Sequence, residues 1–442
     1  MRSSSTRRFS RHFHAALLLF VFVSCAALST SARADAVTDW DVIAFKIVED
    51  SGKTGPATSC DIAMAHVAMH DALNAIDRRY NPYAYDSVAP RGASPVAAIA
   101  AAAHGVLVGR IPNQKTALDA ALASALAAVP EGKAKADGIA TGQAAAAAIL
   151  ARRATDGANV VTPYTPGVEP GVWRPTPPAF TAAIGAGFGR VRPFTLTSSE
   201  QFGPPPAAYF DLRSPEYTAD YKEVKRIGGG ASKARTAEQT KIARFWYETS
   251  PGVHIRLARD LVGAQKLNLW DSARLFALLH LACADSLIAG YGVKYRYNFW
   301  RPVTAIRDGA NDGNPQTIGD QKWNSYLETP SHPEYLSLHA VLAAAWAEVL
   351  CRFFGTDQFS FTVTSAAPYP GIKRSFRSFS QSAQEAADSR VYAGIHFRTS
   401  CSDGLAIGRK IGEHVFSNFL RPMYDDYLQD ARYDDYITSS KR

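Results

Sequence analysis

A proline- and glycine-rich segment, residues 162–206, divides this chain into two stretches with helical patterning. The segment reads TPYTPGVEPGVWRPTPPAF and later GPPP, and it cannot form a regular helix or a central strand because proline lacks an amide hydrogen and fixes φ. Strand-like alternation is scarce elsewhere, so we predict an all-α fold built from helical bundles. The predicted helices cover residues 62–76, 93–109, 115–128, 133–153, 236–245, 258–267, 271–288, 339–354, 382–395 and 403–420.

The same patterns predict the domain organisation. An N-terminal helical region at 35–161 precedes a Pro/Gly-rich connector at 162–235 that wraps over the surface, a C-terminal helical bundle at 236–422 and a polar tail at 423–442. Alanine-rich composition in the first region indicates close helix packing rather than low-complexity disorder. With 442 residues, 47% of them apolar, the chain can bury a large core.

The N-terminus has the features of a secretory signal. Four arginines precede an apolar run at residues 15–28, and Ala32-Arg33-Ala34 is a small-residue cleavage pattern. We predict a signal peptide at 1–34, cleavage after Ala34, and a periplasmic or secreted mature protein. Arg7-Arg8 leaves a twin-arginine route open. We expect no stable membrane span, because no later stretch of about 18 apolar residues stands out.

Cleavage would change the charge and leave four cysteines. It removes five arginines and no acidic residue, so the formal net charge falls from +8 to +3, and a nucleic-acid partner loses its support. The remaining cysteines, in an oxidising compartment, are Cys60, Cys283, Cys351 and Cys401. A disulfide between Cys351 and Cys401 is one expectation, and two unpaired thiols are the alternative.

Cationic and histidine side chains gather in three segments of the last third of the chain. In the first, KYRYNFWRP, Lys294 and Arg301 are seven residues apart, so both would project from one helix face if the helix continued to the proline. The alternative of two surface charges is weakened by Phe299 and Trp300, which indicate a partly buried setting where unpaired cations are costly.

The second and third segments add a hydroxyl, another cation and two imidazoles. In TPSHPEYLSLHA, Ser337 stands near the predicted N-terminus of a helix, where free N–H groups favour an anion, although Ser337 could equally be a helix cap and nothing more. In SRVYAGIHF, Arg390 and His396 are six residues apart, and Gly394 permits a close approach. Together these groups are what a tetrahedral oxyanion needs in order to be held, bonded and protonated.

The order Lys-x6-Arg-Pro, Ser-x-His, Ser-Arg-x5-His resembles the signature of the vanadium-dependent haloperoxidases and the related type 2 phosphatidic acid phosphatases. The segments HVAMHDALNAIDRRYNPY, GVWRPTPPAF and RTAEQTKIARFW also look like the bacterial branch of the haloperoxidases. The resemblance covers nearly the whole mature chain. It implies a helical fold with a four-helix-bundle core and a vanadate cofactor.

The resemblance also implies a role for each site residue. His396 matches the protein ligand bonded to vanadium, His339 matches the acid–base histidine, and Ser337 matches the hydroxyl that binds a vanadate oxygen. The cations that neutralise the equatorial oxygens match Lys294, Arg301 and Arg390. The implied reaction is halide oxidation by hydrogen peroxide, with a small organic substrate as acceptor, and a homo-oligomer stays open.

Two positions near the vanadate site stand out against the family pattern. His332 occupies a place where histidine is associated with bromoperoxidases, which favours bromide or iodide, although His332 could simply lie in a solvent-accessible loop. Leu338 replaces a glycine whose N–H contacts the oxyanion. It brings a branched side chain close to the centre and cannot cheaply adopt positive φ.

Alternative functions remain at this stage. The same residues would serve an acid phosphatase that acts on a phosphate ester, with His396 as the nucleophile that forms a phosphohistidine and His339 as the acid. A non-catalytic relative is the third hypothesis, supported by Leu338 but opposed by the cost of burying a cationic pocket without an anion. His66 and His70 have a spacing that can bind zinc but no evident third ligand, so we expect packing roles.

Overall fold

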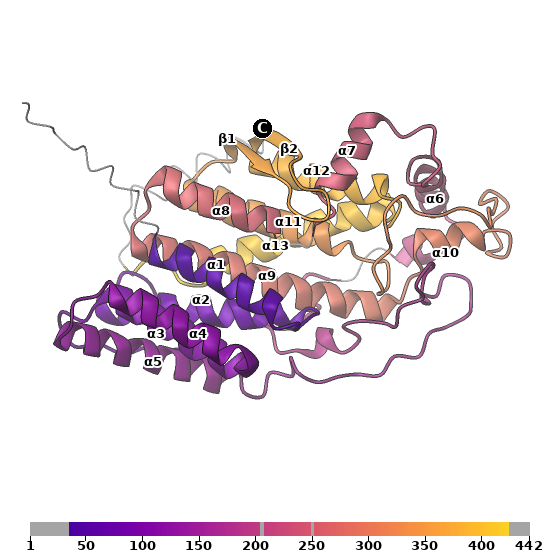
Figure 1. Cartoon of the computed structure of the whole chain (residues 1–442). Coiled ribbons are helices and arrows are strands. Elements are labelled where there is room, and N and C mark those ends of the chain that lie inside the picture. The colour runs from indigo at the N-terminus through magenta and orange to yellow at the C-terminus, as the bar shows by residue number, and fades with distance from the viewer. Residues whose placement is uncertain (1–34, 204–206, 249–251, 424–442) are drawn as a thin grey trace, which may run out of the picture. The chain divides into compact units, whose positions relative to one another are not determined.

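The computed structural model describes residues 35–203, 207–248 and 252–423. The predicted signal peptide at 1–34 and almost all of the predicted tail at 423–442 lie outside these residues. Five helices form the N-terminal part, and Figure 1 shows them side by side (indigo to purple): α1 (Ala36–Asp50), α2 (Ala57–Ile76), α3 (Pro95–Arg110), α4 (Lys115–Ala127) and α5 (Lys133–Arg153). The sequence patterns missed α1.

Small residues allow close packing in this part, as predicted. Ser94 caps α3 by accepting a hydrogen bond from the Ala97 amide, and Pro95 starts the helix without losing a bond. A Cβ atom on Gly142 of α5 would lie 2.3 Å from the Ala98 carbonyl of α3. The two helix backbones can therefore approach this closely only because Gly142 has no side chain.

The connector contains more regular structure than expected. Within the connector, short 3-10 turns lie at η2 (Phe188–Arg190) and η3 (Ala207–Phe210). A third such turn, η1 (Pro112–Gln114), lies outside the connector and precedes α4. The range 162–235 also includes the helix α6 (Pro215–Ile227), which the sequence patterns did not identify. Ser214 caps this helix and buried Tyr217, Tyr221 and Val224 fall at helical spacing. The capping serine and the helical spacing are both visible in the sequence, but the pattern covers only a short stretch.

The C-terminal part holds the remaining helices and one hairpin. The antiparallel strands pair with Phe361 opposite Phe376, and a bulge interrupts the register between Gln358 and Phe361. The hairpin adds a small sheet to an otherwise helical fold. The elements are α7 (Ala237–Phe245), α8 (Gly252–Gln265), α9 (Leu269–Tyr297), α10 (Pro302–Arg307), α11 (Leu338–Phe354), β1 (Gln358–Thr364), β2 (Lys373–Ser378), α12 (Phe379–Tyr392) and α13 (Arg398–Asn418).

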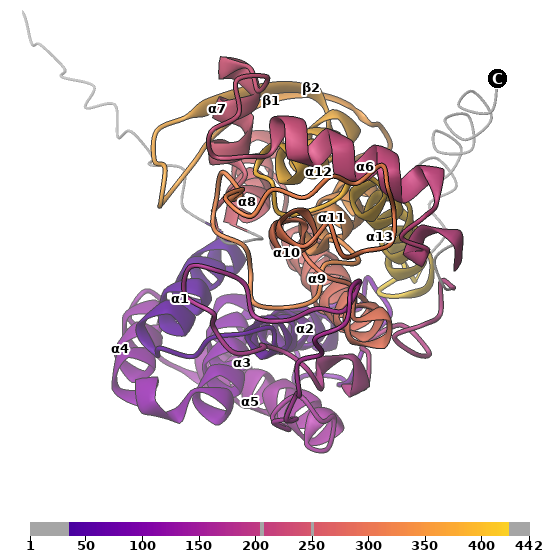
Figure 2. The same ribbon diagram turned by 90° about the vertical axis from the view of Figure 1, so that its right-hand side faces the viewer.

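Helix α9 lies between the two groups of helices and packs on α2 and on α11 (Figures 1 and 2). Its length and apolar composition would be sufficient for a membrane span. Our expectation that no stretch after the N-terminal segment has such a length and composition is therefore wrong. Of its most apolar window, 89% is buried inside the protein. A helix covered on all sides by other helices is apolar all round for that reason.

The predicted disulfide between Cys351 and Cys401 is not formed, and both thiols are buried. Helices α11 and α13 run parallel. The Ser337 amide donates a hydrogen bond to the Ser400 carbonyl near the start of both helices, and further along both helices Gly408 approaches Val341. Cys401 is therefore level with the start of α11, whereas Cys351 lies near its end. Their separation along the helix is about 20 Å at the rise of an α-helix, well beyond the reach of a disulfide.

Candidate active site

The three predicted segments meet at one end of the C-terminal helices. Lys294 lies in the last turn of α9, and Arg301 is the residue before α10. The idea that both cations share one helix face is wrong, because α9 ends at Tyr297 and Asn298 turns the chain with a φ of 50°. The two cations still converge, since this turn brings Arg301 back toward the loop that Lys294 also contacts.

Arg301 is fully buried at the centre of this cluster. Its Nε donates to the His332 carbonyl at 2.9 Å, and its Nη2 lies 2.9 Å from the Nδ1 atom of the same histidine. Its Nη1 lies 2.7 Å from the Ile395 carbonyl and 3.1 Å from the Nε2 atom of His396. Burial lowers the pKa of Arg301 to about 10, so it remains a cation at neutral pH.

Lys294 uses its ammonium group to hold the loop before α11. Its Nζ donates to the carbonyls of Pro333, Glu334 and Leu336 at 2.8, 2.9 and 2.5 Å. Burial lowers the pKa of this lysine, and the neighbouring Arg301 lowers it further. An ammonium group has three hydrogens, so Lys294 acts on an oxyanion here through its charge unless one of these bonds is exchanged.

His396 follows the positive-φ residue Gly394 (φ 78°), whose missing side chain lets the loop pass close to the Gly228 carbonyl. The Nδ1 atom of His396 lies 2.8 Å from Oε1 of the buried Glu334, and the same oxygen accepts the Phe397 amide at 3.0 Å. Burial and the nearby cations lower the pKa of His396, so the ring is neutral. The carboxylate thus holds the proton on Nδ1 and leaves Nε2 as a lone pair.

Glu334 was not predicted as a site residue. Burial raises its pKa to about 7, against the opposing effect of Arg301 and Lys294. The available signal was weak: Glu334 is the acidic residue of the loop between His332 and His339. Its partner lies 62 positions away in sequence, so spacing could not reveal the pair.

Four polar atoms of the cluster are buried without a hydrogen-bond partner among the described residues: Glu334 Oε2, which faces the cations, and the three atoms Ser337 Oγ, His339 Nε2 and Arg390 Nε. Ser337 stands at the N-cap position of α11 but makes no side-chain capping bond, so the plain capping role is not the one observed. A buried polar atom without a partner is costly. The atoms of Ser337, His339 and Arg390 fit an oxyanion that would accept from Ser337 and Arg390 and contact His339.

His339 and Arg390 are positioned by the segment after α7. The Trp246 carbonyl accepts from Arg390 Nη1 at 2.9 Å. Burial lowers the pKa of His339, and the nearby Arg390 lowers it further. An interaction with the Glu248 backbone raises this pKa in part. His339 is therefore a neutral base whose Nε2 can accept a proton. Burial also lowers the pKa of Arg390 to about 10.

Leu338 has an ordinary helical backbone and directs its side chain toward α9. It is the first residue of α11 and adopts no positive φ, so the strain that we anticipated is absent. A Cβ atom on Gly290 of α9 would lie 2.3 Å from Leu338 Cδ2. The leucine side chain thus packs into the space that Gly290 leaves on α9.

His332 is buried, so a solvent-accessible loop position is ruled out. Its ring lies between Arg301 and Tyr291, with a ring-centroid distance of 5.5 Å to the tyrosine. His332 is thus next to His396 through Arg301. Its influence on halide choice stays a prediction.

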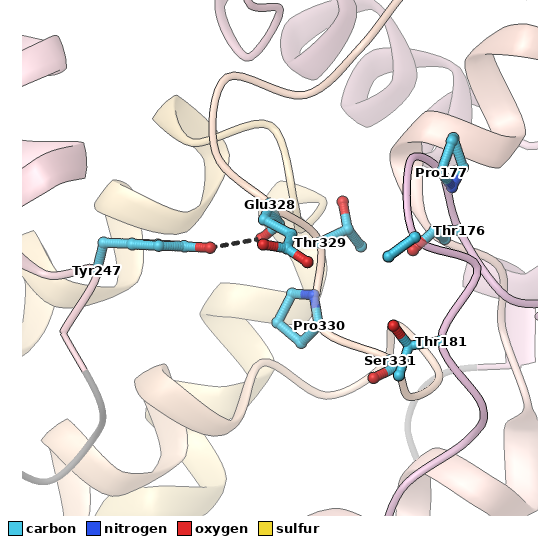
Figure 3. Close-up of a pocket in the computed structure, with 9 residues that line it drawn as sticks. Thr176, Pro177, Thr181, Tyr247, Glu328, Thr329, Pro330 and Ser331 are labelled. Carbon is cyan, nitrogen blue, oxygen red and sulfur yellow. Dashed lines mark hydrogen bonds between the residues drawn. The ribbon is translucent and has the colours of Figure 1, made fainter. Parts of the chain in front are cut away.

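A cavity of about 130 Å³ opens beside this cluster. Its walls come from Tyr247, from residues 328–331 and from four residues of the connector, Thr176, Pro177, Ala179 and Thr181 (Figure 3). Tyr247 donates to the Glu328 carbonyl at 3.2 Å across this space. Ser331 immediately precedes His332, so the cavity and the cluster share one loop.

His66 and His70, whose spacing could bind zinc but for which we expected packing roles, belong to two separate buried groups. His70 bonds to Asp71 and Asn74, whereas His66 joins a different buried group in which Asp41 Oδ1 lies 3.0 Å from His66 Nε2 and 3.2 Å from His280 Nε2. These three residues could hold a metal by distance alone. Asp41 Oδ2, however, also accepts from Arg259 at 2.6 Å, so the carboxylate already has donors on both oxygens.

The fold and site define a protein with a buried, cationic oxyanion centre between helices. The VCPO second helical-bundle domain matches residues 274–424. The vanadium chloroperoxidase of Curvularia inaequalis is 30% identical in an alignment of length 201 that covers 38% of this chain and about a third (32%) of the length of that relative. The structure of an apo-type bacterial vanadium-dependent chloroperoxidase, at 20% identity, covers 82% of this chain and 94% of its own, with a TM-score of 0.67.

The solved structure of a bacterial vanadium-dependent iodoperoxidase is 30% identical, covers 89% of this chain and 97% of its own, and has a TM-score of 0.74. The chain therefore belongs to the vanadium-dependent haloperoxidases. The expected all-α fold and family are confirmed.

Proposed function

We propose that this protein is a vanadate-dependent haloperoxidase that oxidises a halide with hydrogen peroxide. The observation that carries the proposal is the set of three buried atoms without partners, on Ser337, His339 and Arg390, beside His396, whose Nε2 contacts Arg301 Nη1 at 3.1 Å. Three cationic side chains surround one carboxylate there, which leaves an excess of positive charge. A tetrahedral anion would balance that charge and satisfy those atoms.

Each residue of the cluster has a definite task in this proposal. His396 would bond the vanadium through Nε2, while Glu334 holds the ring in the required tautomer. Arg390, Arg301 and Lys294 would supply positive charge toward the vanadate oxygens, and Ser337 would donate its hydroxyl hydrogen. Vanadate bound there supplies a Lewis acid that activates hydrogen peroxide toward halide.

His339 would handle the proton. Its ring is neutral, and its Nε2 atom has no partner among the described residues. It can therefore take a proton from an incoming peroxide and return it to a leaving oxygen. With His332 beside Arg301, we propose bromide or iodide as the preferred halide.

The first experiment uses the metal-free mature chain. Orthovanadate is added, and bromination of a dye is measured with hydrogen peroxide and bromide, with phosphate-ester hydrolysis in parallel. We expect vanadate-dependent bromination that His396→Ala abolishes and that His104→Ala, on the half-buried His104 of α3, preserves. No bromination and no hydrolysis would instead support a non-catalytic member.

The pairing of His396 with Glu334 also favours the second candidate, an acid phosphatase. A buried carboxylate that fixes Nδ1–H makes Nε2 a nucleophile able to form a phosphohistidine, with His339 as the acid. Ester hydrolysis that vanadate inhibits, without bromination, would establish this activity instead.

We also propose export through the segment at 1–34. Expression of the full chain followed by N-terminal sequencing of the exported protein tests this directly. Cleavage after Ala34 would give a mature chain that begins at Asp35. Retention of the intact N-terminus in the cytoplasm would contradict it.

A further inference from the structure

The cavity beside the oxyanion cluster has a lining that excludes several ligands. It carries hydroxyl groups from Thr176, Thr181, Thr329 and Ser331, together with the exposed Glu328, and none of its lining residues is a lysine, arginine or histidine. The Glu328 carboxylate makes no hydrogen bond or ion pair within the described residues. A halide or phosphate would meet repulsion and no cation here. The lining suits a neutral or cationic group that donates hydrogen bonds.

The walls of this cavity are built from segments that also hold the active-site side chains. Tyr247 lies between Trp246, whose carbonyl accepts from Arg390, and Glu248, whose backbone interacts with His339. On the other side, Ser331 is followed by His332, which contacts Arg301. Figure 3 shows Tyr247 facing the 328–331 segment, with Thr176 and Thr181 beyond it. A molecule in this cavity would therefore lie next to the place where halide is oxidised.

Two exposed apolar residues, Phe180 and Ile184, adjoin the segments that line the cavity and are called its rim here; Phe180 also has an unusual backbone conformation. Phe180, between the lining residues Ala179 and Thr181, is 62% exposed and has a φ of 48°, which is rare for an aromatic residue. Ile184 is 41% exposed, and its amide donates to the Ser331 carbonyl at 3.0 Å. Exposed apolar residues beside a polar cavity offer a surface for the ring of an organic molecule.

We propose that this cavity binds the organic acceptor of the oxidised halogen, and that the acceptor is a small phenol, neutral or positively charged. Its hydroxyl or amino group would donate to Glu328 and the neighbouring hydroxyls, with the ring between Tyr247 and the rim. The inference rests on the proposed haloperoxidase function, which supplies the oxidised halogen as hypohalous acid from halide and hydrogen peroxide. In the transfer step a ring carbon forms the carbon–halogen bond, the halogen–oxygen bond breaks, and the ring proton leaves with the oxygen as water.

Two phenols of similar ring reactivity and opposite charge test the proposal: tyramine and 4-hydroxyphenylacetate. Both are offered together with hydrogen peroxide and bromide, and the ratio of brominated products is compared with that from reagent hypobromite. We expect the enzyme to favour tyramine by about fivefold, the size of one moderate charge interaction. Glu328→Gln should return the ratio toward the reagent value, and Glu328→Lys should reverse it.

The matched control is Glu131→Gln, on an exposed carboxylate that pairs with Lys135 away from the cavity. It should leave the ratio unchanged. A wild-type product ratio equal to that of reagent hypobromite, or the same ratio in Glu328→Gln, would overturn the proposal. Triiodide formation without any organic substrate should be equal in all variants, because it reports the halide oxidation alone.

A binding measurement separates this proposal from the proposed function. Saturation-transfer NMR with tyramine needs no vanadate, halide or peroxide, and it should show binding to the wild type that weakens in Glu328→Gln but not in Glu131→Gln. If triiodide formation fails while this binding is seen, the haloperoxidase function is wrong and the transfer step with it. If triiodide forms but tyramine binds both variants equally, the acceptor site is wrong and the function stands.

Discussion

Two buried clusters of histidine and charge differ in what they leave unsatisfied. Around Asp41, the carboxylate receives His66, His280 and Arg259, so one anion faces one permanent cation and two imidazoles. In the active site, three cations surround one carboxylate, and polar atoms on Ser337, His339 and Arg390 have no partner among the described residues. The first cluster is closed in charge by its own side chains, although His66 Nδ1 has no partner among the described residues. The second cluster keeps an excess of positive charge that an external anion would balance.

The difference teaches that burial and histidine content alone do not mark a binding site. Burial would raise the pKa of Asp41, but hydrogen bonds from His280 and His66 outweigh it and lower that pKa. Burial instead lowers the pKa of every cation in the active site. Buried charge that neighbouring side chains compensate indicates a structural role. Buried charge that remains in excess indicates a site for a ligand of opposite charge.

The largest expected effect comes from breaking the closed cluster. Asp41→Asn leaves Arg259 and the two histidines without their anion, and loss of one partner of a buried ion pair costs about 3–5 kcal/mol. Denaturant unfolding would measure this loss. Vanadate-dependent activity per folded molecule should be unchanged, so a selective loss of activity without loss of stability would contradict the structural assignment.

The second prediction removes a cation from the active site, whereas the first removed the anion of the Asp41 cluster. Arg390→Met should lower halide oxidation by about 10²–10³-fold, as expected for a buried group that stabilises developing charge. Its stability should be equal to or higher than that of the wild type, because an uncompensated buried cation is lost. Steady-state rates and unfolding curves on the same preparation test both parts, and a strongly destabilised but active variant would refute the comparison.

The closed cluster should also make the fold sensitive to acid. Burial lowers the pKa of His280 to about 4, below its ordinary value of 6.5, so the unfolded chain takes up this proton first as the pH falls. Stability is therefore fully present above about pH 6.5 and is lost toward pH 4, by roughly 3 kcal/mol from this group. Unfolding free energies at pH 7 and 4.5 should differ less in His280→Gln than in the wild type. An equal difference in both proteins would show that His280 is not responsible.

A smaller effect tests how Glu334 acts through His396. Glu334→Gln keeps the shape but removes the charge beside Nδ1, and we expect vanadate to bind about 10–100-fold more weakly. Ser400→Ala, which removes a longer 3.4 Å contact to the same ring nitrogen, is the matched comparison and should have less effect. Vanadate titration followed by ⁵¹V NMR would measure both. Equal effects would mean that Glu334 has no special positioning role.

Much of the architecture was predictable because local patterns determine it. Helical spacing and composition located ten of the helices, since each pattern depends on neighbours within one or two turns. Some ends were missed: α9 continues to Tyr297, beyond the predicted end at 288, and α8 begins at Gly252, before the predicted start at 258. Ser337 and His339 are two residues apart, so their joint placement at the start of α11 follows from the sequence. The order of the three segments sufficed to indicate the family.

Only the tertiary structure decided how the clusters are completed. Glu334 meets His396 across 62 positions, and Asp41 meets His280 across 239, so no local pattern could pair them. The direction of the Leu338 side chain depended on the space at Gly290 of another helix. The sequence thus determined which chemical groups are present and on which helices they lie. The packing of distant helices decided which groups are neutralised and which are left open for a ligand, because burial cost depends on the partners that the fold supplies.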